Sequence, residues 1–418
     1  MAIGVAGEPS TTTVSNVSKN YTVPLMLMVS LYFGIGFITA LNDILVPHFK
    51  DLFHLTNVTA LLVQFCFFGA YFVMSVPSGW IVGKIGYKSG IVVALSVMGL
   101  GLLLFLPASV VIFYPLFLCA LFVVGSGLAL LQVAINPYIG ALGSPETASS
   151  RLNLAGGFNS IATTIAPRVG AAFIFIAAGA SVAQLAHSVR MPYAILATCA
   201  FAMAVVTAFV QLPDVIEKGG AESRSGGSAW NFSHLRLGAL AIFFYVGAEV
   251  AIGSIMITYL SQPSMGGLSH EAAARYVSLY WGGAMVDRFI GFVALRKVRA
   301  QRALAFVSLI AALLIGVAIA THGHVAMWAV VSCGLFNSVM WPCIFPLSVN
   351  GLGRFTSQGS GILITMVVGG AVIPEIQGFL SDTLGYQRSF AIVLLCYVYI
   401  FFFAIRGHRN LSVVTDRS

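Results

Sequence analysis

The sequence predicts an all-α membrane protein whose twelve transmembrane helices form two pseudo-symmetric six-helix bundles. Three observations support this prediction. Only 8% of the 418 residues are charged and 59% are hydrophobic, whereas soluble domains carry about 25% charged residues. The hydrophobic residues form long continuous runs, unlike the alternating pattern of outer-membrane strands. Similar motifs also recur in the two halves of the chain, as expected of two bundles related by an axis along the membrane normal.

Twelve runs reach the length of about 20 apolar residues that a helix needs to cross a bilayer. The predicted spans are residues 22–48, 57–82, 89–107, 111–139, 152–179, 190–212, 235–261, 271–295, 302–320, 324–350, 358–381 and 387–406. A polar linker between the sixth and seventh spans divides the chain. The predicted domains are an N-terminal tail (1–20), a first bundle (21–212), the linker (213–234), a second bundle (235–406) and a C-terminal tail (407–418).

The distribution of basic residues predicts the orientation of the chain. The net charge is +8, and most Lys and Arg residues fall in loops that share one side of the predicted membrane. This is the positive-inside bias of bacterial inner-membrane proteins, so both termini are predicted to be cytoplasmic. The basic surplus therefore reflects membrane topology and does not indicate nucleic-acid binding. No cleaved signal peptide is expected, because the polar N-terminal segment lacks a basic region before a short apolar core.

The first span contains the most informative residue, Asp43. An ionised carboxylate at membrane depth costs roughly 3 kcal/mol, so such acids usually face a water-filled cavity and mark a transport pathway. We therefore predict a transporter in which Asp43 carries the coupling ion. Glu249 in the seventh span is the second candidate for this role, and the alternative for Glu249 is a structural acid paired with a neighbouring side chain.

The end of the second span carries small and basic residues. Small residues let two helices approach closely, and basic residues stay at the cytoplasmic surface. Plain helix packing explains this pattern as well as a gate between the two bundles does. The residues predicted to be gating or structural here are Gly79, Lys84, Gly86 and Lys88.

A related pattern near the end of the eighth span contains Gly283, Asp287 and Arg288. Asp287 and Arg288 are predicted to be gating or structural, as a pair close to the cytoplasmic surface. Arg168 and Glu375 each follow a proline at equivalent places in the two halves, and are either opposing gate charges or locally paired.

Polar side chains inside the spans indicate a binding site for a polar solute such as a sugar. Amides present both donors and acceptors to sugar hydroxyls, and aromatic faces cover the apolar surface of a sugar ring. For any one amide the alternative is a hydrogen bond to a neighbouring helix, and for an aromatic ring it is packing or lipid contact. The predicted substrate-binding residues are Gln64, Gln132, Asn136, Asn159, Asn337, Gln377 and Trp281, with Phe68, Tyr245, Tyr280 and Trp341 as further aromatic candidates.

No pattern in the sequence indicates catalysis, a cofactor or a metal site. The six cysteines lie inside apolar spans without paired spacing, which is typical of small buried hydrophobic residues. Walker and HExxH motifs are missing from the sequence. We therefore predict a monomer embedded in a lipid bilayer, with no enzyme activity.

Several blocks of the chain resemble the fucose/galactose/glucose:proton symporter family of the major facilitator superfamily, and especially its bacterial glucose/galactose transporters. The resemblance extends from about residue 20 to residue 405. It implies a twelve-helix importer of glucose and galactose that works by alternating access in the inner membrane, coupled to protons. The blocks are LNDILVPHF, QFCFFGAYF, LQVAINPY, SSRLNLAGGFNS, YVGAEVAIGS, YWGGAMVDRFIG and GLFNSVMWPCIFPLS.

The resemblance also implies roles for single residues. Asp43 falls on the family's proton-site aspartate, and Asn159 falls on a sugar-contacting asparagine. Gln132 stands where the fucose permease has an essential glutamate, whereas Glu249 stands where that permease has Gln. This exchange argues against fucose as the substrate. Our hypothesis is that Glu249 takes over part of the electrostatic role that is lost at Gln132.

Other functions remain open from the sequence. Sodium could replace the proton, because a lone carboxylate serves either ion. A facilitative carrier for another polar solute is a further alternative, and so is a drug exporter, which should have a larger and more apolar cavity. A membrane enzyme and a sugar sensor that does not transport are the remaining classes.

Overall fold

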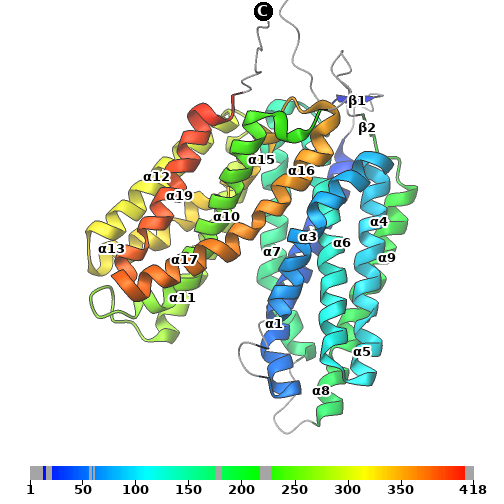
Figure 1. Ribbon diagram of the computed structural model, residues 1–418, viewed down its shortest axis with the longest axis horizontal. Helices are drawn as coiled ribbons and strands as arrows, with labels where there is room; N and C mark the ends of the chain where they lie inside the picture. The colour runs from blue at the N-terminus through cyan, green and yellow to red at the C-terminus, as the bar shows by residue number, and fades with distance from the viewer. Residues whose placement is uncertain are drawn as a thin grey trace, which may run out of the picture.

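The protein is almost entirely helical in the computed structural model, which describes residues 13–15, 21–55, 59, 62–174, 181–216 and 227–409 (Figure 1). The helices form two groups that lie side by side. The first half is built from the chain before residue 217, and the second half from the chain after residue 226. Each half has its own core of buried apolar side chains, so each is a packed bundle and not an open layer of helices.

The first half begins with a long helix that spans the whole height of the molecule. Its described helices are α1 (Thr22–Phe53), α3 (Leu62–Ile85), α4 (Tyr87–Leu103), α5 (Phe105–Val111), α6 (Tyr114–Ala141), η1 (Pro145–Thr147), α7 (Ala148–Ile174), α8 (Val182–Ser188) and α9 (Arg190–Phe209).

The second half contains more breaks than the first, mainly between α13 and α17. Its described helices are η2 (Ala229–Asn231), α10 (Ser233–Leu260), α11 (His270–Ala294), α12 (Ala300–Ala320), α13 (Gly323–Ser332), α14 (Gly334–Asn337), α15 (Met340–Val349), η3 (Gly353–Phe355), α16 (Thr356–Thr365), η4 (Met366–Val368), α17 (Gly369–Leu384), α18 (Tyr386–Ser389), α19 (Ala391–Phe402) and η5 (Phe403–Gly407).

Two short strands mark one end of the molecule. β1 (Thr13–Ser15) pairs antiparallel with β2 (Asp214–Ile216), with Val14 opposite Val215. This pairing joins the chain before α1 to the chain that follows α9. Figure 1 shows both strands at the top of the molecule, at the same end as the last turn of η5. We call this end the strand end.

The described helices account for the twelve predicted spans. Nine are long and apolar enough to cross a membrane, and α13–α14 together with α15 form a tenth span that bends by 42°. α7 and α11 have 27 and 25 residues and are therefore long enough to cross as well. Their polar residues, among them Asn159 in α7 and Arg288 in α11, lower their hydropathy below that of the other spans.

The two halves pack closely against each other at the strand end, where glycines remove the side chains that would separate the helices. A Cβ added to Gly79 in α3 would lie 2.7 Å from the backbone oxygen of Ser357 in α16. A Cβ added to Gly361 in α16 would lie 2.5 Å from the backbone oxygen of Ser75 in α3. Only glycine fits at either position, so the sequence permits a tight seam between α3 and α16.

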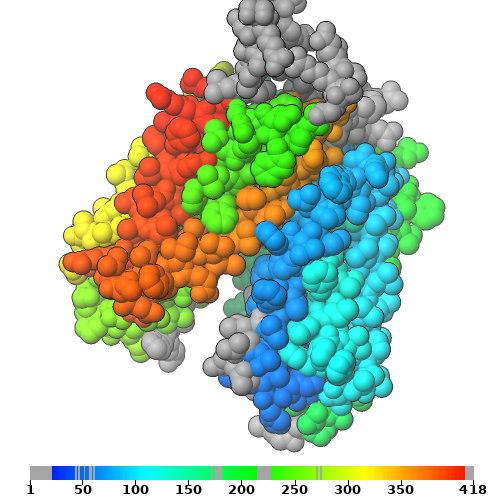
Figure 2. Space-filling model, in the orientation of Figure 1, coloured from blue at the N-terminus to red at the C-terminus, as the bar shows by residue number. Residues whose placement is uncertain are grey.

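The halves separate at the other end of the molecule. Figure 2 shows a cleft between them there, with the first half on one side and α11 and α17 on the other. A molecule closed at one end and open at the other gives a ligand access from one side, as alternating access requires of each of its states.

Candidate functional site

A cavity of about 300 Å³ lies between the two halves and is lined by both of them. Its volume is at the lower end of the range for small-molecule sites. Helices α1, α3, α6 and α7 form one wall, and α10, α11 and α15 form most of the other. The polar and aromatic lining residues are Tyr32, Thr39, Phe68, Tyr71, Gln132, Asn159, Thr163, Tyr245, Glu249, Arg288, Ser338 and Trp341.

One face of α1 forms part of the wall. Tyr32, Ile35, Gly36 and Thr39 all line the cavity, and their spacing of three or four residues places them on a single helical face. Position 43 follows Thr39 by four residues, so the same periodicity places the Asp43 backbone on this face. The side chain of Asp43 lies outside the part of the structure that is described.

The predicted sugar contact Asn159 reaches the cavity because α1 and α7 pack closely. A Cβ added to Gly36 would lie 2.5 Å from the Asn159 backbone oxygen and 2.7 Å from its side-chain nitrogen. The Asn159 amide donates a hydrogen bond of 3.0 Å to the backbone oxygen of Tyr32. This bond fixes the side chain and leaves its Oδ1 as an acceptor for a ligand.

Gln132 is oriented by a tyrosine from a neighbouring helix. Its Nε2 donates a hydrogen bond of 3.0 Å to the hydroxyl of Tyr71 in α3, and both side chains line the cavity. One amide therefore joins α6 to α3 and presents its remaining polar atoms to a ligand.

The opposite wall contributes two charged groups and two aromatic rings. Glu249 in α10 and Arg288 in α11 line the cavity together with Tyr245 and Trp341. The centroids of these two rings are 6.5 Å apart. Arg288 is close enough to act electrostatically on Tyr32, Tyr245 and Glu249. The cavity thus offers amides and aromatic faces for a sugar, and an acid and a base for charge coupling.

The prediction that Asp287 and Arg288 form a surface-proximal pair is wrong. Because α11 continues to Ala294, both residues lie about two turns inside the helix. Asp287 is 5% exposed, and its Oδ2 accepts a hydrogen bond of 3.0 Å from the backbone N–H of Val339. This bond caps the break between α14 and α15. Arg288 points into the cavity instead.

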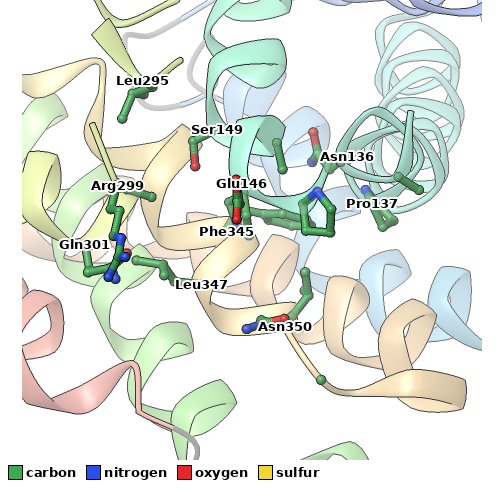
Figure 3. Close-up of a pocket in the computed structure, with 18 of the residues that line it drawn as sticks. Asn136, Pro137, Glu146, Ser149, Leu295, Arg299, Gln301, Phe345, Leu347 and Asn350 are labelled. Carbon is green, nitrogen blue, oxygen red and sulfur yellow. The ribbon is translucent and has the colours of Figure 1, made fainter. Parts of the chain in front are cut away.

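Asn136 lies between this cavity and a second one. Its Oδ1 accepts a hydrogen bond from the hydroxyl of Tyr32, which lines the first cavity. Asn136 itself lines a cavity of about 550 Å³ at the strand end, together with Glu146, Ser149, Arg299 and Asn350 (Figure 3). Asn136 is therefore placed in the partition between the two cavities, and not in the wall of the smaller one.

The larger cavity has a different chemistry. It lies between the ends of α6, α7 and α15 and the connection from α11 to α12. Arg296, Lys297 and Arg299 are exposed side chains at its rim. We take the smaller cavity as the candidate substrate site, because it brings together amides, aromatic rings and Glu249 between the halves.

Besides Asn136, four of the predicted substrate-binding residues lie outside the smaller cavity. Gln64 accepts a hydrogen bond of 2.8 Å from Asn42. Asn337 is fully buried, with hydrogen bonds of 2.7 Å to Tyr280 and Tyr397. The remaining two, Gln377 and Trp281, are respectively buried and 45% exposed. Of the further aromatic candidates, Phe68, Tyr245 and Trp341 line the smaller cavity, and Tyr280 does not.

The residues of the second-span motif lie at the strand end. Gly79 is in the seam with α16, and Lys84 is exposed at the end of α3. Gly86 has φ = +81° between α3 and α4, a conformation that glycine adopts without strain. Lys88 is half-buried in the first turn of α4. These positions are compatible with a structural or a gating role.

The sequence interpretation missed several residues of the cavity wall, among them Tyr32, Thr39 and Tyr71. One signal could have found the first two. Tyr32 and Thr39 precede Asp43 by eleven and four residues, and both intervals are close to whole turns of a 3.6-residue helix. Tyr71 carries no comparable signal, since only the packing of α3 against α6 brings it to Gln132.

The sequence pattern of the Major Facilitator Superfamily matches residues 28–374. The chain belongs to this superfamily. A glucose/galactose transporter of Brucella abortus biovar 1 (strain 9-941) is 50% identical over 400 residues, which cover 95% of this chain and 97% of that protein. The L-fucose-proton symporter of Escherichia coli (strain K12) is 32% identical over 410 residues, which cover 93% of each protein.

A solved structure extends this relationship to three dimensions. The crystal structure of the E. coli symporter FucP in the outward conformation matches this transporter with a TM-score of 0.84 at 31% identity. The match covers 93% of this chain and 99% of that one. The predicted fold and the resemblance to sugar:proton symporters are thereby confirmed.

Gln132 provides a direct test of the site. We expect Gln132→Ala to raise the sugar concentration for half-maximal counterflow about fivefold or more, because a buried hydrogen bond to a ligand is worth about 1–3 kcal/mol. Radiolabelled hexose counterflow in proteoliposomes measures this. Gln377→Leu is the matched control. Both amide atoms of Gln377 are buried without a hydrogen-bond partner among the described residues, so the control should keep the wild-type affinity. An equal loss of sugar affinity in both variants would contradict the assignment of the smaller cavity as the sugar site.

Proposed function

We propose that this transporter imports a monosaccharide of the glucose/galactose type together with protons by alternating access. The observation that carries the proposal is the cavity between the halves, which combines the Gln132 and Asn159 amides with the aromatic rings of Tyr245 and Trp341 and the acid Glu249. Relatives whose names specify glucose/galactose transport and fucose-proton symport support the substrate class and the coupling ion.

The proposed roles of individual residues follow from their positions. Gln132 and Asn159 bind sugar hydroxyls, and Trp341 covers the apolar face of the ring. Asp43 carries a coupled proton, since position 43 continues the cavity-lining face of α1, and Glu249 is the second ion-coupling acid. Asn136 acts in the partition between the two cavities and does not bind sugar in the present conformation.

The proposed setting is the bacterial inner membrane, with a monomeric protein and both termini in the cytoplasm. The asymmetry of the basic loops supports this orientation, and the exposed Arg296, Lys297 and Arg299 at the strand end agree with it. The strand end is then cytoplasmic and the cleft in Figure 2 opens outward. The proposed domain boundaries are those predicted from the sequence.

Asp43→Asn tests the proposed coupling. We expect this variant to lose accumulation driven by a pH gradient and to keep sugar counterflow, because exchange needs no net proton movement. Uptake and counterflow in the same proteoliposomes measure both activities. Gradient-driven uptake that survives the substitution would contradict the role of Asp43. If a sodium gradient alone drives uptake, the coupling ion is sodium and not the proton. If drugs compete for transport and sugars do not, the protein is an exporter.

A further inference from the structure

Arg288 joins the two halves at the candidate site. Its Nη1 donates hydrogen bonds of 2.7 Å to the backbone oxygen of Gly156 and 2.8 Å to the Oγ of Ser160. Arg288 belongs to α11 in the second half, and both acceptors belong to α7 in the first half. A Cβ added to Gly156 would lie 3.3 Å from the Cδ of Arg288, so the glycine leaves room for the arginine. The guanidinium thus makes a contact that depends on how the halves are arranged.

Glu249 lines the same cavity but has an incomplete set of contacts. Its Oε1 is buried and has no hydrogen-bond partner among the residues that the structure describes. Arg288 acts on the carboxyl group through its charge, and Tyr245 forms a side-chain hydrogen bond with it. Asp287 in α11 is also close enough to interact with Glu249 electrostatically. Asp287, the nearest acid in sequence to Arg288, is turned to the Val339 N–H. A carboxylate with an unpartnered oxygen is costly to ionise away from water unless a cation pairs with it.

We propose that Arg288 is a movable counter-ion, bound to α7 in the present conformation and to the Glu249 carboxylate once the strand end opens. Opening at that end must draw α7 away from α11, because these helices belong to opposite halves. The guanidinium stays charged and needs new acceptors. Glu249 is the acid on its own half that lines the same cavity, so the pair can form without further movement of the first half. This proposal rests on the proposed function and deepens it.

The movement of Arg288 from α7 to Glu249 couples the change of conformation to the release of a proton. As the guanidinium reaches Glu249, the neutral carboxyl gives its proton to cavity water and the carboxylate accepts N–H bonds from Arg288. No other covalent bond changes, the hydrogen bonds from Arg288 to Gly156 and Ser160 are broken, and the released proton leaves on the side that has opened. Conversely, a protonated Glu249 cannot form the ion pair, so protonation favours the present conformation and ionisation favours opening of the strand end.

A distance measurement across the strand end tests the exchange without relying on transport. Spin labels at Ile85→Cys and Val298→Cys, both 42% exposed, report the separation of the halves in a background without the six native cysteines. Pulsed electron paramagnetic resonance is recorded without sugar over a range of pH. In the parent we expect the fraction with a long distance to rise with pH as Glu249 ionises.

Four substitutions distinguish the contact of Arg288 with α7 from its proposed contact with Glu249. Ser160→Ala removes an acceptor in α7 and should increase the long-distance fraction about two- to tenfold at each pH, while the pH dependence remains. Glu249→Gln should leave the short distance dominant and abolish the pH dependence. Arg288→Gln should remove the pH dependence in the same way, and Glu249→Gln added to it should then change nothing further. Arg288→Lys keeps the charge and should retain part of the pH dependence.

Two results would overturn the proposal. One is an unchanged pH profile in Glu249→Gln, and the other is additive effects of the Glu249 and Arg288 substitutions. Tryptophan fluorescence checks that each variant is folded, and its response to added glucose measures sugar binding separately from the distance. Counterflow by the parent tests the proposed function separately, so loss of sugar transport and loss of the Arg288 exchange would be told apart.

Discussion

Gly361→Val is expected to abolish most sugar uptake by preventing the strand end from closing. The Cβ of any side chain at this position would lie 2.5 Å from the backbone oxygen of Ser75, and neither backbone can move without separating α16 from α3. Overpacking of this kind costs about 1–3 kcal/mol, which corresponds to roughly a fivefold to 150-fold shift toward the conformation with the strand end open. Transport slows because the cycle must pass through both conformations.

The matched control for this variant is Gly69→Val. Gly69 lies in α3, the helix that Gly361 contacts, but no heavy atom lies within 4 Å of the position that its Cβ would take. We expect it to transport at nearly the wild-type rate. Uptake into proteoliposomes and the spin-label distance across the strand end measure the two effects together. Equal uptake in the two variants would show that the seam between α3 and α16 does not need to close.

Asn337→Ala is expected to destabilise the protein strongly and to change sugar affinity little. The amide of Asn337 donates to the Tyr280 hydroxyl and accepts from the Tyr397 hydroxyl, both at 2.7 Å. The Tyr280 hydroxyl in turn donates to the backbone oxygen of Glu249 at 3.1 Å. Truncation leaves two buried hydroxyls without this partner and creates a small cavity, at a cost of about 2–4 kcal/mol. Thermal unfolding in detergent measures the loss.

A variant that removes the whole network separates the polar contacts from the packing. The substitutions Tyr280→Phe, Asn337→Leu and Tyr397→Phe replace every member by an apolar side chain, so few buried polar groups lose their partners. We expect this triple variant to be more stable than Asn337→Ala alone. If Asn337→Ala instead weakened sugar binding and left the unfolding temperature unchanged, the prediction from sequence that Asn337 contacts the sugar would regain support.

The candidate site was only partly predictable. Their chemistry identified Gln132, Asn159 and Glu249 as candidates, because polar groups are rare in membrane spans and usually mark a functional site. The same reasoning predicted that Asn337 and Gln377 bind substrate. Asn337 instead forms hydrogen bonds inside the second half, and Gln377 is buried away from the cavity. An amide in a span signals a polar contact, but the sequence does not say whether the partner is a sugar or another helix.

Arg288 shows why part of the site escaped sequence reasoning. Near the end of a span an arginine is expected at the membrane surface, where it satisfies the positive-inside bias. Its actual place depends on a glycine at position 156 and on the approach of α7 from the other half. Both conditions lie far from Arg288 in the chain, so no local pattern could contain them.

Composition and the length of the apolar runs determined by themselves that this chain crosses a membrane about twelve times, because transfer of each run into lipid depends only on its own residues. The recurrence of motifs determined that it is built from two related halves. The tertiary structure decided which polar side chains share a cavity, which end of the molecule is closed, and that Arg288 reaches α7. Those features depend on the rotation and separation of helices, which are set by contacts between residues far apart in the chain.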